Sequence, residues 1–266
     1  GVQTCALPIS VIILDRPNPI GGINVCGNIT EKEYLSFVGI APIAIQHGMT
    51  VGELACFFNG EGLLGEGLKV NLEVIKVKNW KRSQLYSETD LNWINPSPNM
   101  VSLEAAMVYP GLCLLEGTNV SEGRGTKKPF LTCGAPYIIS DELITALRKY
   151  NFEGVDFLPT TYTPIDIPNM ASNPKYKNLT CNGIEIIIDK TKNFDAVKLG
   201  ITIIYEINKI YKGKFEFRKK SIDRLYGSSK LFDYITEGKS LDDIFNSWNP
   251  DLKKFKEQRT KYLLYN

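Results

Sequence analysis

Apolar positions along this chain follow two kinds of pattern, and each predicts a different element. Val11–Leu14 is apolar throughout, as expected of a parallel strand covered on both faces, and Asp15 stands at its end. From Thr50 to Asn59 the apolar residues recur at helical spacing, and Thr50 with Glu53 forms a capping box. The residues expected on the apolar face of this helix are Val51, Leu54, Ala55 and Phe58.

The same two patterns predict the remaining elements. In chain order they are a half-buried strand over 68–74, a helix over 102–108 that Pro110 ends, a buried strand over 112–115, a capped helix over 140–150, a strand over 184–188, a helix over 195–210, a short strand over 215–217, and a last helix over 250–265. This order predicts an α/β unit followed by an α+β unit, with a boundary near residues 110–115 and polar loops facing the join.

A central parallel strand is not expected to open a domain after only ten residues. We therefore expect that the upstream part of the first domain is missing from this chain. The first ten residues, Gly1–Ser10, show neither a helical nor a strand period of their own.

Composition narrows the class of protein. Hydrophobic residues make up 43% of the chain and charged residues 23%, which is typical of a soluble globular protein. A net charge of +2 gives no electrostatic argument for nucleic acid, and no apolar run approaches the ~20 residues that span a bilayer. We interpret the basic segment 253–261 as a solvated helix face. The six cysteines form no C-x-x-C pair, which favours free thiols over a zinc site.

The segment Glu116–Thr126, EGTNVSEGRGT, carries the densest set of candidate chemical groups. A loop this polar is expected at a surface or in a cleft. Glycoside cleavage commonly needs two carboxyl groups, and Glu116 and Glu122 are the candidate catalytic pair. Six residues of loop allow separations from ~5 to ~20 Å, so retaining and inverting mechanisms both stay open. Alternatively, one glutamate pairs with Arg124 and only shapes the loop.

Other candidate polar groups lie within proline-rich and glycine-rich loops. In DRPNPIGG, Asp15, Arg16 and Asn18 are candidates for binding substrate, although Asp15 can equally pair with Arg16 or bond within the turn. Asn99 is either a hydrogen-bonding group for substrate or a turn residue. His47, the single histidine of the sequence, is either structural or an acid/base catalyst, and excludes any multi-histidine metal site.

Long ordered motifs give a resemblance that these single residues do not. DRPNPIGG at 15–22, HGMTVGELA at 47–55, PSPNM at 96–100, EGTNVSEGRGTKKPF at 116–130 and GAP at 134–136 resemble the DUF1343 family. This NamZ-like family includes exo-β-N-acetylmuramidases, glycosidases that act on bacterial cell-wall sugars. The resemblance runs from about Val11 to Tyr265. It implies an α/β fold, in which a partial Rossmann-like catalytic domain over 11–112 precedes a smaller α+β auxiliary domain over 113–266.

The resemblance also implies a function. We expect an exo-β-N-acetylmuramidase-like hydrolase that releases N-acetylmuramic acid from non-reducing ends of peptidoglycan fragments. Arg124 would bind the lactyl carboxylate of this sugar, and Asn119 and Ser121 its hydroxyl or acetamido groups. The alternatives are a non-catalytic wall-sugar-binding protein, an inactive fragment whose catalytic acid lies upstream, and a hydrolase acting on another sugar. No cofactor is implied, and the family suggests a periplasmic or secreted bacterial protein.

Overall fold

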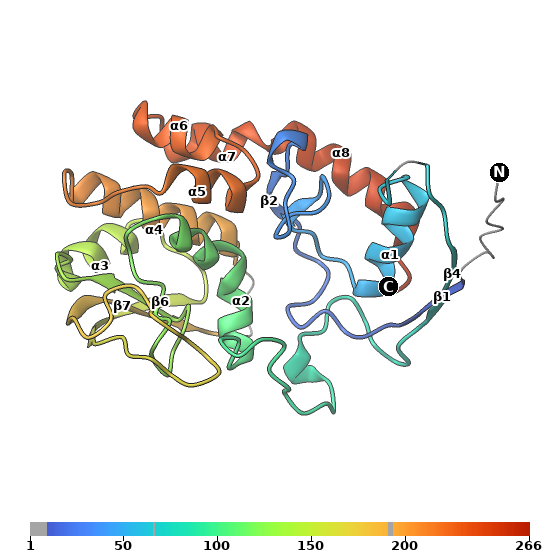
Figure 1. Cartoon of the computed structure of the whole chain (residues 1–266), viewed down its shortest axis with the longest axis horizontal. Coiled ribbons are helices and arrows are strands. Elements are labelled where there is room, and N and C mark those ends of the chain that lie inside the picture. Colours follow the sequence, from blue (N-terminus) through green and yellow to red (C-terminus); the bar gives the residue numbers. More distant parts are fainter. Residues whose placement is uncertain (1–9, 66, 191–193) are drawn as a thin grey trace, which may run out of the picture.

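The computed structural model describes residues 10–65, 67–190 and 194–266 and confirms a mixed α/β fold (Figure 1). Its strands are β1 (Ser10–Leu14), β2 (Cys26–Ile29), β3 (Ala44–Gln46), β4 (Asn71–Ile75), β5 (Thr132–Ala135), β6 (Val155–Tyr162) and β7 (Cys181–Ile188). Its α-helices are α1 (Val51–Gly60), α2 (Leu103–Leu112), α3 (Ser140–Arg148), α4 (Ala196–Ile210), α5 (Lys219–Tyr226), α6 (Lys230–Thr236), α7 (Leu241–Ser247) and α8 (Asn249–Arg259). The segment 1–9, including Cys5, lies outside the described residues.

The N-terminal lobe contains β1 to β4 and α1. Strand β1 is parallel, as expected, and it pairs with β4, with Val11 opposite Leu72. Helix α1 packs against both strands. The prediction that β1 is covered on both faces is wrong for the described part of the chain, because Ile12 is 60% exposed and Leu14 is 75% exposed. Within those residues the strand pairs with β4 alone, so its outward apolar side chains lack a covering layer.

Helix α1 begins as predicted and buries a different face. Thr50 accepts a hydrogen bond from the Glu53 N–H, and Glu53 accepts one from the Thr50 N–H, which confirms the capping box. The buried residues are Gly52, Glu53 and Phe57, while Val51 is 42% exposed. The predicted face was wrong because the prediction considered apolar residues only. The Glu53 carboxylate is buried as well, and its partners are described below.

The buried strand predicted over 112–115 is wrong. Helix α2 continues through Pro110 to Leu112, and a 3₁₀ helix follows over Cys113–Gly117. Leu112, Leu114 and Leu115 are nevertheless fully buried, and a short apolar run cannot distinguish a buried strand from a buried helix. Tertiary packing decides the matter, because α2 crosses α4 at the close contact between Gly111 and Gly200.

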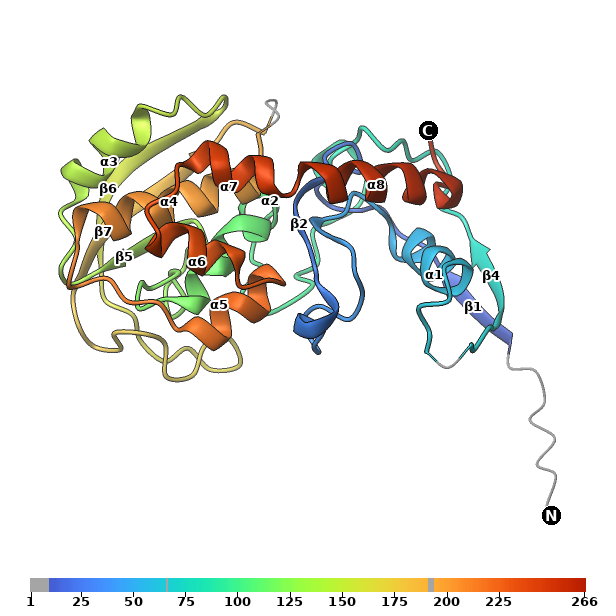
Figure 2. The same ribbon diagram turned by 90° about the horizontal axis from the view of Figure 1, so that it is seen from above.

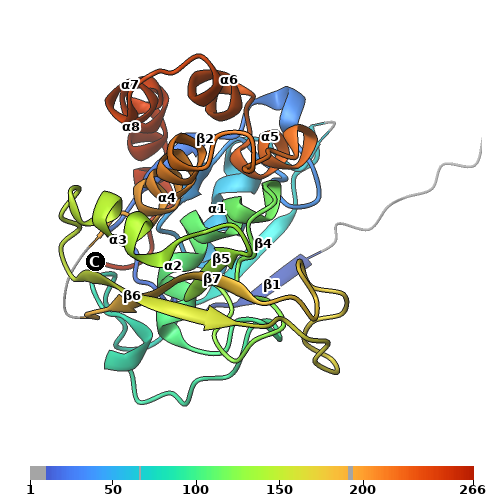
Figure 3. The ribbon, with the colours of Figure 1, turned by 90° about the vertical axis from the view of Figure 1, so that its left-hand side faces the viewer.

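The C-terminal lobe contains an antiparallel sheet in the order β5–β7–β6. Helices α3 and α4 lie over one side of this sheet (Figure 3). The predicted helices over 140–150 and 195–210 and the strand over 184–188 are confirmed, although Ser140 lies inside α3 rather than capping it. The strand expected over 215–217 is reduced to one bridge between Thr118 and Phe217.

The chain then returns to the N-terminal lobe through α8 (Figure 2). Phe255 on α8 contacts Phe57 on α1, with 5.7 Å between ring centroids. The predicted last helix ends at Arg259 and is followed by a 3₁₀ helix over Thr260–Tyr262. The lysines of this segment are solvated as expected, whereas Arg259 is 9% exposed and is an exception.

The division into domains at 112/113 stays a prediction, and it falls between α2 and the following 3₁₀ helix. The five described cysteines are free, in agreement with the interpretation as thiols. In the part of the chain that the structure describes, we find no helix with the length and apolar character needed to cross a membrane.

Candidate functional site

A cavity of about 770 Å³ lies where the two lobes meet, and we call it the Glu116 cavity. Its walls come from the loops after β1 and β3, from the β2–β3 loop and β3, from α1 and α2, from the segment 113–124, and from the end of α5. Of the predicted site residues, the structure brings four to its lining: Asn18, His47, Glu116 and Arg124. The other six do not line it: Asp15, Arg16, Asn99, Asn119, Ser121 and Glu122.

Glu116 and Arg124 form an ion pair on the cavity wall. Arg124 Nη2 lies 2.9 Å from Glu116 Oε1, and both side chains are about one-third exposed. The Arg124 guanidinium also lies 5.1 Å from the centre of the Phe130 ring, and its Nε is 3.5 Å from Glu122 Oε1. Burial alone would lower the pKa of Arg124, but the hydrogen bond and charge of Glu116 raise it above its ordinary value. Arg124 is thus engaged by two carboxylates.

The rest of the 116–126 loop is more buried than its polarity predicted, so the expectation of a loop at a surface or in a cleft is wrong for its middle. Ser121 is 1% exposed and exchanges backbone hydrogen bonds with Gly134 of β5. Glu122 is 4% exposed, and Lys175 Nζ lies 3.0 Å from its Oε2. Lys175 also donates to the carbonyls of Leu115 and Val120. Buried polar groups are tolerated here because they have partners.

The two asparagines outside the cavity hold loops together. Asn119 donates to the Lys214 carbonyl and accepts from the Tyr137 hydroxyl at 2.8 Å. Asn99 is 4% exposed and donates to the Met170 carbonyl at 2.6 Å. In each case the side-chain amide joins two segments that are distant in sequence.

His47 and Asn18 line the cavity, and both also make local bonds. His47 Nδ1 accepts the Met49 N–H at 3.1 Å, so Nε2 carries the proton of the neutral ring. Burial, followed by the charge of Arg259, lowers the pKa of His47 to about 4. His47 is therefore a neutral hydrogen-bond donor at pH 7 rather than a charged acid. Asn18 donates to the Met49 carbonyl and accepts from the Ile20 N–H.

Asp15 is fully engaged away from the cavity. Its carboxylate accepts from the N–H groups of Arg16 and Gly52, both at 2.9 Å, from the Thr50 hydroxyl at 2.7 Å, and from the Tyr265 hydroxyl at 2.6 Å. Gly52 permits this approach, because a Cβ at that position would lie 2.8 Å from the Asp15 carboxyl carbon. Arg16 is exposed, and only its backbone joins this arrangement.

A buried network beside Asp15 was missed from the sequence. Glu53 is completely buried and pairs with Arg82, and it also accepts from the Leu264 N–H at 2.7 Å. Arg259 and Arg82 each donate to the Gly48 carbonyl at 2.8 Å. Arg259 continues the buried stripe of Leu252 and Phe255 at helical spacing, a signal that could have identified it. We find no such signal for Arg82.

Further residues of the cavity were also missed. Tyr109 on α2 and Arg224 on α5 both line it. Burial raises the pKa of Tyr109 to about 12, so its phenol stays protonated and can donate. Burial and then the charge of Glu116 raise the pKa of Cys113 to about 12, so this thiol is not a ready nucleophile. Among the described residues, no group of three or more His, Cys, Asp or Glu side chains is placed to hold a metal.

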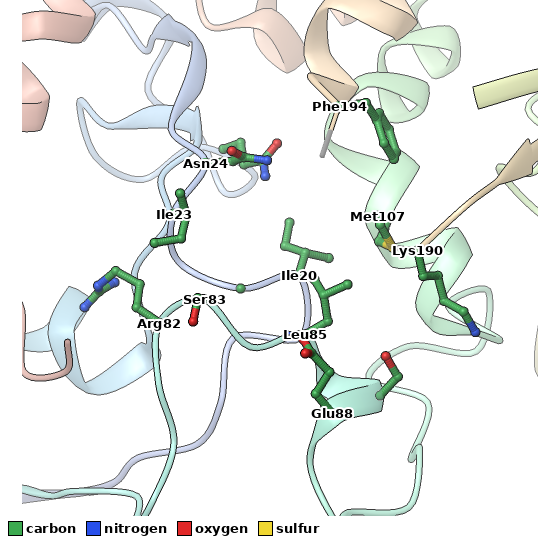
Figure 4. A pocket seen from close by; sticks show the side chains of 13 residues that line it. Ile20, Ile23, Asn24, Arg82, Ser83, Leu85, Glu88, Met107, Lys190 and Phe194 are labelled. Atoms are coloured by element: carbon green, nitrogen blue, oxygen red, sulfur yellow. Dashed lines mark hydrogen bonds between the residues drawn. The ribbon is translucent and has the colours of Figure 1, made fainter. Parts of the chain in front are cut away.

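A second cavity of about 660 Å³, the Arg82 cavity, also lies between the lobes (Figure 4). Ile23, Asn24 and Arg82 line one wall, and Met107, Lys190 and Phe194 line the opposite wall. It shares Ile20 and Gln46 with the Glu116 cavity, and none of the predicted site residues lines it. The Arg82 guanidinium extends away from the opposite wall, toward its partner Glu53.

Comparison with known proteins identifies the family. Models of the N- and C-terminal domains of exo-β-N-acetylmuramidase NamZ match residues 3–104 and 107–265. The peptidoglycan β-N-acetylmuramidase NamZ of Bacillus subtilis (strain 168) is 42% identical over 258 residues, which are 97% of this chain and 60% of that protein. The chain therefore spans less than two-thirds of that relative.

Two crystal structures of DUF1343-family proteins from Bacteroides fragilis NCTC 9343 have similar folds. One superposes with a TM-score of 0.84 at 30% sequence identity, and the match covers 96% of this chain and 66% of the chain in that crystal structure. The other superposes with a TM-score of 0.75 at 34% identity, covering 97% and 66%. This chain belongs to the exo-β-N-acetylmuramidase NamZ family, which is also called DUF1343.

Proposed function

We propose that this chain provides the sugar-binding cavity of an exo-β-N-acetylmuramidase, a hydrolase that releases N-acetylmuramic acid from the non-reducing ends of peptidoglycan fragments during cell-wall turnover. The observation that carries the proposal is the Glu116 cavity, where family motifs from both lobes place a carboxylate, a neutral imidazole and hydrogen-bond donors around one space. Membership of the NamZ family supports the choice of sugar.

Glu116 is the proposed acid/base or nucleophilic group. It is the carboxylate that reaches the cavity among the described lining residues, and Arg124 holds it in place. His47 Nε2–H and the Tyr109 hydroxyl are donors suited to sugar hydroxyl or acetamido oxygens. Glu122 would act indirectly, by fixing Arg124 from its buried position.

One observation favours a second candidate function, namely binding of wall sugars without hydrolysis. A two-carboxylate mechanism needs a partner for Glu116, and the described lining of the cavity contains no second carboxylate. The partner would have to come from residues outside that lining. If it is absent, the cavity keeps recognition and loses cleavage.

The test uses the β-1,4-linked disaccharide of N-acetylmuramic acid and N-acetylglucosamine, with N-acetylmuramic acid at the non-reducing end. Product release is followed by mass spectrometry, and binding by calorimetry. We expect hydrolysis that Glu116→Gln lowers by about 10²-fold or more, which is a general acid/base contribution. Binding without release supports the second candidate. If the protein shows no binding and no release, both candidates are refuted.

We also propose that the protein acts where peptidoglycan fragments are found, in the periplasm or outside a bacterial cell. The support is the expected substrate. Fractionation of cells that produce the full gene product tests this, and recovery with cytoplasmic markers would contradict it.

A further inference from the structure

Charge in the Glu116 cavity is not balanced. The charged side chains among its described lining residues are Glu116, Arg124 and Arg224, while His47 is neutral because its pKa is about 4. Glu116 and Arg124 neutralise each other at 2.9 Å. Arg224 is exposed, and among the described residues it takes part in no ion pair or side-chain hydrogen bond. The cavity thus keeps one uncompensated cation.

Arg224 also stands on a firmly placed element. Helix α5 packs against the 3₁₀ helix that carries Glu116, so closely that a Cβ on Gly117 would lie 2.7 Å from the Ile222 Cα. The end of α5 is held by the N-terminal lobe, because the Gly227 carbonyl accepts the Glu31 N–H at 2.8 Å. An arginine whose backbone is fixed from both lobes loses less freedom when it binds a ligand.

We propose that Arg224, rather than Arg124, binds the carboxylate of the substrate and makes the cavity select N-acetylmuramic acid over N-acetylglucosamine. The inference rests on the proposed function. The two sugars differ by the lactyl ether, which adds one carboxylate, and a free guanidinium binds a carboxylate in a bidentate manner. Arg124 would have to break its ion pair with Glu116 to bind this carboxylate. Arg224 has no ion pair with a described residue to break.

The test measures binding of N-acetylmuramic acid and of N-acetylglucosamine to the full chain by calorimetry or ligand-observed NMR. We expect wild type to prefer N-acetylmuramic acid by about tenfold or more, as a charged hydrogen bond allows. Arg224→Gln should abolish this preference and leave the affinity for N-acetylglucosamine unchanged. Arg224→Lys should restore part of it, because the charge returns without the bidentate geometry.

Lys220→Gln is the matched control, since it removes one exposed positive charge from the same helix outside the cavity lining. It should keep the preference. Equal binding of the two sugars by wild type, or an unchanged preference in Arg224→Gln, overturns the role of Arg224 and leaves the proposed function standing. If wild type binds neither sugar, the proposed function fails and this inference fails with it.

Discussion

The polar motifs of the two lobes are used in opposite ways. In the N-terminal lobe, Asp15, Thr50 and Glu53 are saturated by protein partners, and the loops present Asn18 and His47 to the cavity. In the C-terminal lobe the 116–126 loop buries its middle and presents an ion pair of Glu116 with Arg124 that remains about one-third exposed. The first set of groups holds loops together, and the second lines the Glu116 cavity.

This difference indicates which polar residues of a motif are candidates for binding or catalysis and which are structural. A carboxylate with four donors, such as Asp15, has its charge satisfied and its geometry fixed by the fold. A carboxylate with one partner at a cavity wall keeps free lone pairs for a substrate. The difference between the two lobes can be tested by making the same kind of substitution in each of them.

The largest effect is expected at the buried pair. Glu53→Ala leaves Arg82 buried without its counter-charge and should lower the free energy of unfolding by about 3–5 kcal/mol. Glu116→Ala, in the exposed pair, should lower it by at most about 1 kcal/mol. Urea denaturation followed by circular dichroism measures both, and equal losses would refute the contrast between the lobes.

The second largest effect on stability is expected where α2 crosses α4. A Cβ on Gly111 would lie 1.8 Å from the Ala196 carbonyl oxygen, so Gly111→Ala must push α2 and α4 apart. We expect a loss of about 3 kcal/mol in the same assay. Gly39→Ala is the control, since the nearest atoms lie 3.7 Å from its Cβ and the change should be small. Comparable stability of the two variants would show that the crossing is not a tight fit.

The smallest effect concerns His47 and depends on pH. Its pKa is lowered from 6.5 to about 4, so below pH 6.5 the unfolded chain binds a proton that the folded chain does not. Stability should therefore fall as pH falls, by about 2 kcal/mol between pH 7 and pH 5 from this group. His47→Gln should remove that component. Urea denaturation of both proteins at the two pH values tests it, and identical pH dependence would contradict the burial of a neutral imidazole.

Local signals in the sequence predicted the elements they control. The capping box at Thr50 and the helix over 195–210, capped by Asp195, depend on neighbouring residues and were found. The run 112–115 depends on the crossing of α2 and α4, so its helical form could not be derived from an apolar stretch. Burial of Glu53 depends on Arg82 and the segment after α8, which no local pattern reveals.

The candidate site was predicted in part for the same reason. The motif loops led to Asn18, His47, Glu116 and Arg124, which the structure gathers around one cavity. Asp15 and Asn99, expected in the same crevice, lie outside its lining. The Asp15 carboxylate bonds to the first turn of α1, and the Asn99 amide bonds to the Met170 carbonyl. Arg224 could not be foreseen, since its position follows from how α5 docks between the lobes. The roles of all these residues in binding or catalysis stay predictions.

The return of α8 to the N-terminal lobe has a consequence for synthesis of the chain. Asp15 and Tyr265, 250 positions apart, share a hydrogen bond of 2.6 Å. During translation, the contacts that join these N-terminal loops to α8 and the residues after it cannot form until that part of the chain has left the ribosome. Such a delay is expected of long-range contacts. A nascent chain halted before α8 would expose these loops to chaperones and proteases.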